Sequence, residues 1–83
     1  MESNFVNYKY YLSIAEAKEG DLVEDLNGRK IEILQFFVSK SKIDPYYYVG
    51  CVLSESGIRT GELINLLPKD IKSVKKKAIN DPI

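Results

Sequence analysis

The feature that most constrains the fold of this chain is a series of short segments in which apolar and polar side chains alternate with a period of two. These segments lie between residues 20 and 74, and Asn-Gly, Ser-Gly and Pro-containing turns separate them. Period-two alternation is typical of a β-strand with one buried face, and closely spaced turns are typical of small all-β domains. The sequence therefore predicts a mainly β domain with five short strands.

The longest segment, KIEILQFFVSK, carries apolar side chains on both of its faces. Strict alternation divides them into two sets, Ile31, Ile33 and Phe37 against Leu34, Phe36 and Val38. Burial on both sides predicts a long, curved strand that is shared between two packed sheets. The pair Asn27 and Gly28 precedes this strand and predicts a tight type I′ hairpin turn, because both residues tolerate a positive φ.

Three consecutive tyrosines open the next segment, YYYVGCVLS. Alternation places one set on a predicted core face, namely Tyr47, Val49, Cys51 and Leu53. The other set is Tyr46, Tyr48, Gly50 and Val52. If this second face is open, its two rings form an aromatic platform for a partner or for nucleic-acid bases. The competing expectation is that the N-terminal segment folds over the face and buries it.

The N-terminal segment FVNYKYYLSI also alternates, which predicts a strand. Ser13 and Glu16 have the spacing of a capping box, so one helical turn is expected between Ser13 and Glu19. We therefore divide the chain into an extension over residues 1–19, a β-domain over residues 20–74 and a basic tail over residues 75–83. The tail has little apolar material and is expected to be frayed.

The layout of residues 20–74 resembles a known superfold. GDLVED, NGRKIEILQFF, YYYVGCVLSESGIRTGEL and LLPKDIKSV are similar in order to the strands and turns of the SH3-like small barrel in its bacterial and phage form. The resemblance implies a small, closed five-stranded barrel with the N-terminal extension attached to it. It implies no particular activity, because this superfold hosts many unrelated functions.

Composition excludes the commonest catalytic chemistry. The chain has 83 residues, no histidine and one cysteine, so neither a histidine base nor the usual Cys/His zinc site can be built. The acidic residues between 16 and 25 are expected to be solvated surface charge, and Cys51 a core residue. We expect no enzyme activity, no cofactor and no metal. No apolar run is long enough for a membrane span, and the start lacks a signal-peptide core, so a cytoplasmic protein is expected.

Two classes of function remain from the sequence. The twelve basic and twelve acidic residues cancel, which favours a protein-binding module over a phosphate-binding one. The alternative is a small nucleic-acid-binding barrel that uses Tyr46, Tyr48, Arg59 and the lysines near the C-terminus. The candidate partner-binding residues are Tyr46, Tyr48, Lys42, Arg59, Lys72, Lys75 and Lys76. An exposed edge strand would permit either a monomer or a homodimer. Small size with abundant Lys, Ile and Asn is typical of an accessory or inhibitor protein of a phage or mobile element.

Overall fold

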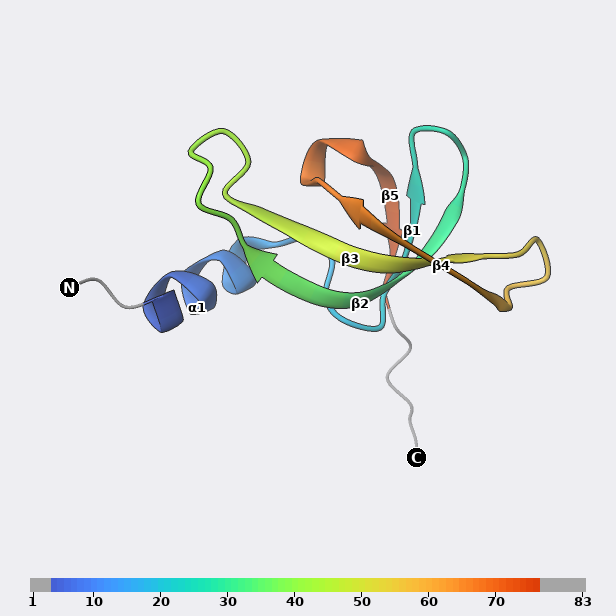
Figure 1. Ribbon diagram of the computed structural model, residues 1–83, viewed down its shortest axis with the longest axis horizontal. Coiled ribbons are helices and arrows are strands. Elements are labelled where there is room, and N and C mark those ends of the chain that lie inside the picture. Colours follow the sequence, from blue (N-terminus) through green and yellow to red (C-terminus); the bar gives the residue numbers. More distant parts are fainter. Residues whose placement is uncertain (1–3, 77–83) are drawn as a thin grey trace, which may run out of the picture.

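The computed structural model describes residues 4–76 and shows a mainly β domain (Figure 1). It contains one α-helix, one 3-10 helix and five strands. The elements in chain order are α1 (Asn4–Ile14), β1 (Leu22–Asp25), β2 (Lys30–Val38), β3 (Tyr46–Leu53), β4 (Arg59–Leu66), η1 (Pro68–Asp70) and β5 (Ile71–Lys75). The prediction of a five-stranded, mainly β fold is confirmed.

The five strands form one antiparallel sheet in the order β4-β3-β2-β1-β5. Strands β1 to β4 follow one another as a meander, and η1 then returns the chain to the far side of β1. Within residues 4–76 the two edge strands, β4 and β5, are not hydrogen-bonded to each other. The prediction of a closed barrel is therefore wrong, since the sheet is bent around its core but remains open, and the second packed sheet expected from the segment KIEILQFFVSK is not formed.

The N-terminal segment is a helix, so the predicted strand is wrong. Its sequence also satisfies helical spacing, because Tyr8, Tyr11 and Leu12 stand at positions i, i+3 and i+4 and all three pack against the core. The ring of Tyr8 lies 5.5 Å from that of Phe36, edge to face. Helix α1 ends at Ile14, and the helical turn expected between residues 13 and 19 is not formed. Figure 1 shows α1 beside the end of β2.

A bulge in β2 decides which of its side chains are buried. The pairing of β2 with β3 shifts between Ile33 and Gln35, which leaves Leu34 as the extra residue. After the bulge the alternation changes phase, so that Phe36 joins Ile31 and Ile33 in the core and Phe37 turns to the outer face. The two predicted apolar sets of this strand are therefore wrong from Leu34 onward.

Strand β3 has the predicted alternation but the opposite orientation. Tyr48, Gly50 and Val52 face the core, whereas the sequence analysis placed Tyr47, Val49 and Leu53 there. Gly50 is required at this position because a Cβ atom would collide with Cγ2 of Ile31. The hydroxyl of Tyr48 is bonded to Ala17 in the segment after α1, and α1 itself packs against the neighbouring rings of Phe36 and Tyr46. Covering of this face by the N-terminal segment is thus confirmed, although a helix and not a strand provides it.

The hairpin between β1 and β2 is wider than the predicted type I′ turn. The N–H of Gly28 donates to the carbonyl of Asp25, and the N–H of Asp25 donates to the carbonyl of Arg29, each at 3.0 Å. Gly28 has φ of +86° at the end of this turn. This is the pattern of a type I turn followed by a bulge glycine. The buried carboxylate of Asp25 selects it, because Oδ1 accepts the N–H groups of both Asn27 and Arg29.

Candidate functional site

The three tyrosines of β3 have three different environments. Tyr48 is 1% exposed, and its hydroxyl donates to the carbonyl of Ala17 at 3.1 Å and accepts the N–H of Ala17 at 3.4 Å. Burial raises the pKa of Tyr48 to about 12. Tyr46 is half-buried against the rings of Tyr11 and Phe36. The open platform expected for Tyr46 and Tyr48 is therefore not formed, because α1 and the segment after it cover this face.

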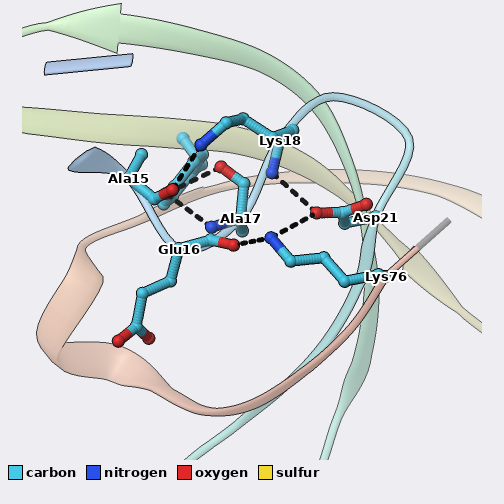
Figure 2. Close-up of polar contacts among 7 residues, drawn as sticks. Ala15, Glu16, Ala17, Lys18, Asp21 and Lys76 are labelled. Carbon is cyan, nitrogen blue, oxygen red and sulfur yellow. Dashed lines mark hydrogen bonds and ion pairs between the residues drawn. The ribbon is translucent and has the colours of Figure 1, made fainter. Parts of the chain in front are cut away.

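We call residues 15–21, between α1 and β1, the linker. A polar network fixes it to the end of β5 (Figure 2). Within the linker, the N–H of Lys18 donates to Oδ2 of Asp21 at 2.8 Å, and the ammonium group of Lys18 donates to the carbonyl of Ala15. From β5, the ammonium group of Lys76 donates to the carbonyl of Glu16 and lies 3.4 Å from Oδ2 of Asp21. The buried Asp21 thereby joins the two ends of the domain.

Beside the linker, two adjoining hollows of about 580 and 370 Å³ run along η1 and β5. Ile14, Glu16 and Ile71 line both hollows, so we treat them as one surface and call it the β5 groove. Among the predicted site residues, the groove is lined by Tyr46, Tyr48, Lys72 and Lys76. The fold therefore brings together two tyrosines and two lysines that are more than twenty positions apart in sequence.

The other predicted site residues lie elsewhere. Lys75 lines a third hollow together with Leu22 and Lys30, which shares only Ser73 and Val74 with the β5 groove. Lys42 is exposed in the loop between β2 and β3. Arg59 stands on β4, at the opposite edge of the sheet from β5. These three residues thus belong to three separate surfaces.

The sequence analysis missed an apolar surface on the outer face of β2, β3 and β4. Phe37 and Tyr47 are paired across the strands and their rings stack at 5.3 Å with an angle of 20°. Leu63 on β4 stands on the same face and is 61% exposed, and Val49 is half-buried between the strands. We call these four residues the outer apolar face. The available signal was the pair of adjacent phenylalanines in β2, since neighbouring residues of a strand cannot both face the core.

An ion pair borders the outer apolar face. Arg59 on β4 donates to Glu32 on β2 through Nε at 2.7 Å and through a terminal nitrogen at 3.0 Å. Glu32 is the cross-strand neighbour of Cys51, and Arg59 is that of Leu53, so the pair crosses over β3. It helps to cover the Cys51 thiol, which is 2% exposed. The hydrogen bonds and charge of Glu32 raise the pKa of Arg59 and keep its guanidinium engaged.

The described residues offer no further kind of site. Residues 4–76 contain no group of three side chains suited to hold a metal ion, and none of their helices is long and apolar enough to cross a membrane. Comparisons with protein-family models, with curated proteins and with solved structures find no match. The functional argument therefore depends on the geometry of the outer apolar face and of the β5 groove.

Proposed function

We propose that this chain is a non-enzymatic protein-binding module, and that its partner protein docks on the outer apolar face. The observation that carries the proposal is the stacked pair Phe37 and Tyr47, with Val49 and then the largely exposed Leu63 further along the same face. Aromatic rings anchor protein interfaces at a low cost in side-chain entropy, and contiguous exposed apolar surface is typical of interaction sites. A partner with a matching apolar patch would bury this face.

Charge supports a protein partner over nucleic acid at this face. The single arginine near it, Arg59, is already paired with Glu32. Lys72 and Lys76 lie at the opposite edge of the sheet. Binding to single-stranded nucleic acid requires aromatic rings and cationic side chains along the same groove. The alternative, a nucleic-acid-binding domain, would use the β5 groove, where Tyr46 lies near Lys69, Lys72 and Lys76.

The buried titratable groups support a structural role rather than catalysis. Asp25 is held by three hydrogen bonds from its own turn, and the Tyr48 hydroxyl is held by the main chain of Ala17. Tyr48 lines the β5 groove, but its hydroxyl is bonded to Ala17, and the carboxylate of Asp25 is bonded within its turn, so neither group is a free acid or base. The lone buried Cys51 suits a reducing compartment, so we place the proposed binding in the cytoplasm. The small size and the composition of the chain suit an adaptor or inhibitor protein of a phage or mobile element.

The experiment is a capture assay on a lysate of the host cell with three immobilised proteins. Leu63→Glu places a charge in the outer apolar face, and Leu26→Glu places the same charge at an equally exposed leucine in the hairpin between β1 and β2. We expect the wild type and Leu26→Glu to retain the same partner protein and Leu63→Glu to lose it. Equal capture by all three proteins contradicts the proposed surface.

A second arm separates the two classes of function. Fluorescently labelled oligo(dT) and a duplex of the same length are titrated with the protein at low and moderate salt. The proposed function predicts that neither nucleic acid binds through Lys72, so Lys72→Glu should remove no binding. Salt-sensitive binding that this substitution abolishes would replace the protein-binding proposal by the nucleic-acid alternative.

A further inference from the structure

We propose that the β5 groove is a second binding site, separate from the outer apolar face, and that it takes an extended acidic segment of a partner protein. The main chain of this segment would add to the free edge of β5, and its acidic side chains would contact lysines beside the groove. Three observations carry the proposal: the open strand edge, the apolar lining and the distribution of charge.

The first observation is the free edge of β5. Within the described residues this strand pairs with β1 alone, so one of its edges has no strand partner. Four successive residues, Ile71–Val74, line the larger hollow. The pairing with β1 shifts between Glu24 and Asp25 and leaves Lys72 as an extra residue, and the hollow follows β5 along all four positions. Main-chain groups at such an edge are the ones that pair with an added peptide strand.

The second observation is the apolar lining. Ile14, at the end of α1, is 51% exposed and lies on the far side of the groove from β5. Ile71 and Val74 are half-buried and pack against the core from β5. A peptide strand presents every second side chain to one face, so such side chains can contact this lining while the others remain in solvent. The lining therefore suits a segment in which apolar and polar residues alternate.

The third observation is the charge around the groove. Lys69, Lys72 and Lys76 line it, against the single carboxylate of Glu16. Lys76 is engaged by the linker, whereas Lys69 and Lys72 form no ion pair with any other residue in the described range. Two ammonium groups are thus available to acidic side chains of a ligand. Contacts of this kind contribute mainly to specificity and to the rate of association.

Glu16 sets the orientation of the charges along the groove. Figure 2 shows its side chain pointing away from the linker network and toward the ribbon of η1 and β5. Glu16 lines both hollows, so its carboxylate stands in the middle of the groove, between Lys69 at the tyrosine end and Lys72 at the other end. Acidic residues of the ligand therefore belong beside Lys69 and beside Lys72, at either side of Glu16. A neutral or basic residue belongs beside Glu16.

The same geometry disfavours single-stranded nucleic acid as the occupant. Stacking of bases requires exposed ring faces. Among residues 4–76, the rings that line the groove are those of Tyr48, which is buried, and of Tyr46, which packs against Tyr11 and Phe36. A peptide needs no stacking surface, because its main chain bonds to the strand edge.

The test is a titration of the isotopically labelled protein, followed by amide chemical shifts, with a synthetic capped peptide of alternating valine and glutamate. Two matched peptides are controls: lysine replaces glutamate in one, and proline replaces alternate valines in the other. We expect the acidic peptide to shift the amides of residues 71–75 and the two controls to fail. The lysine peptide has the wrong charge, and the proline peptide lacks the N–H groups that pair with a strand.

Variants locate the site. Lys72→Glu should weaken binding of the acidic peptide by about tenfold, the effect of reversing one partly exposed charge contact. Lys40→Glu, in the loop between β2 and β3, should leave the affinity unchanged. Leu63→Glu should also leave it unchanged, which separates this site from the outer apolar face.

Three results would overturn the proposal. One is equal binding of the acidic and the lysine peptides. Another is a set of shifted amides on β4 in place of β5. The third is the absence of any shift with the acidic peptide at millimolar concentration, while oligo(dT) shifts the amides of residues 71–75. That last outcome would assign the groove to nucleic acid.

Discussion

The hydroxyl of Tyr48 holds the main chain of Ala17 from a position 31 residues further along the chain. The hydroxyl donates to the carbonyl and accepts the N–H of the same residue, so one side chain satisfies both polar groups of a fully buried residue. The sheet and the linker are joined at this point. The third tyrosine of the run is thus explained by the need to hold the linker.

Replacement of Tyr48 by Phe should destabilise the domain. The substitution keeps the ring in the core but leaves the N–H and carbonyl of Ala17 buried without this partner, which costs about 1–3 kcal/mol. Urea unfolding measures the difference in the free energy of unfolding. Tyr47→Phe on the outer face is the matched control and should change the free energy by less than about 0.5 kcal/mol. Equal effects of the two substitutions would contradict the assigned role of the hydroxyl.

The raised pKa of Tyr48 predicts a loss of stability at alkaline pH. The folded state holds its pKa at about 12, against 10.0 for a free tyrosine, because burial disfavours the phenolate. The unfolded chain therefore loses this proton first, and the contribution of Tyr48 is complete below pH 10 and disappears as the pH rises toward 12. Urea unfolding of the wild type and of Tyr48→Phe at about pH 8 and pH 11 isolates this group from the lysines. A stability difference that does not shrink with rising pH would contradict the prediction.

Much of the fold could be predicted from local pattern, and the errors have physical causes. The existence of five strands followed from alternation and turn residues. Cys51 is buried as expected, but on the outer face beside the Glu32-Arg59 pair and not on the predicted core face. Alternation separates the two faces of β3 but does not say which one is covered, because the cover is supplied by α1. The segment FVNYKYYLSI fits the period of a strand and that of a helix. Tyr8 and Leu12 would share one face of a strand, and they also stand at positions i and i+4 on one face of a helix. Tertiary contacts with Phe36 and Tyr46 select the helix.

The candidate sites depended on information that no single segment contains. The outer apolar face exists because Leu34 forms a bulge and turns Phe37 outward, and no residue type specifies a bulge at that position. The β5 groove exists because the chain returns through η1 to pair with β1. Only that long-range pairing brings Lys72 and Lys76 to the linker and to Tyr46. The sequence therefore suggested the association of these lysines with Tyr46 and Tyr48, but not the groove that joins them, nor the separation of Lys42, Arg59 and Lys75 from it.

The linker network predicts a local effect of removing Lys76. Lys76→Met takes the ammonium group from the buried Asp21 and from the carbonyl of Glu16, and we expect a loss of about 1 kcal/mol, because the lysine itself is largely exposed. Hydrogen exchange should accelerate at the Lys18 and Gly20 amides, which are bonded to Asp21 and to Ile33. Lys75→Met is the control and should leave these amides unchanged. Unaltered exchange in Lys76→Met would show that the linker does not depend on this contact.

Asp25 predicts a loss of stability in acid. Burial by itself raises the pKa of this carboxyl, but the hydrogen bonds from the N–H of Arg29, from its guanidinium and from the N–H of Asn27 outweigh burial and lower the pKa. The contribution of Asp25 is thus present above its unfolded pKa of about 3.9 and is lost as the pH falls through the lower folded value. Asp25→Asn should cost about 1–3 kcal/mol at pH 7 and progressively less below pH 4.

Urea unfolding at about pH 7 and pH 2.5 measures this change for Asp25→Asn. Glu24→Gln, on the same hairpin and with its side chain half-exposed, is the control and should have little effect at either pH. If Asp25→Asn costs as much in acid as at neutral pH, the ionised carboxylate is not what stabilises the turn.

The contact between Gly50 and Ile31 predicts an energetic coupling between β3 and β2. In Gly50→Ala the new Cβ collides with Cγ2 of Ile31 and stands 3.0 Å from the carbonyl oxygen of Glu32, so the strands must move apart at a cost of about 1–3 kcal/mol. Ile31→Ala removes Cγ2 and by itself costs about 2–5 kcal/mol for the cavity it leaves. The double variant should cost less than the sum of the two single variants by about 0.5–3 kcal/mol, because the methyl group added at position 50 then occupies space that the isoleucine has vacated.

Gly57→Ala supplies the comparison for this cycle. Gly57 has φ of +88° and no atom near its would-be Cβ, so the substitution adds backbone strain of about 1 kcal/mol without a clash. Its effect should add to that of Ile31→Ala, since the two residues share no contact. Urea unfolding of both sets of variants measures the couplings. The prediction is contradicted if the effects of Gly50→Ala and Ile31→Ala on the free energy of unfolding simply add, as those of Gly57→Ala and Ile31→Ala should. The close approach of β2 and β3 would then not require a glycine.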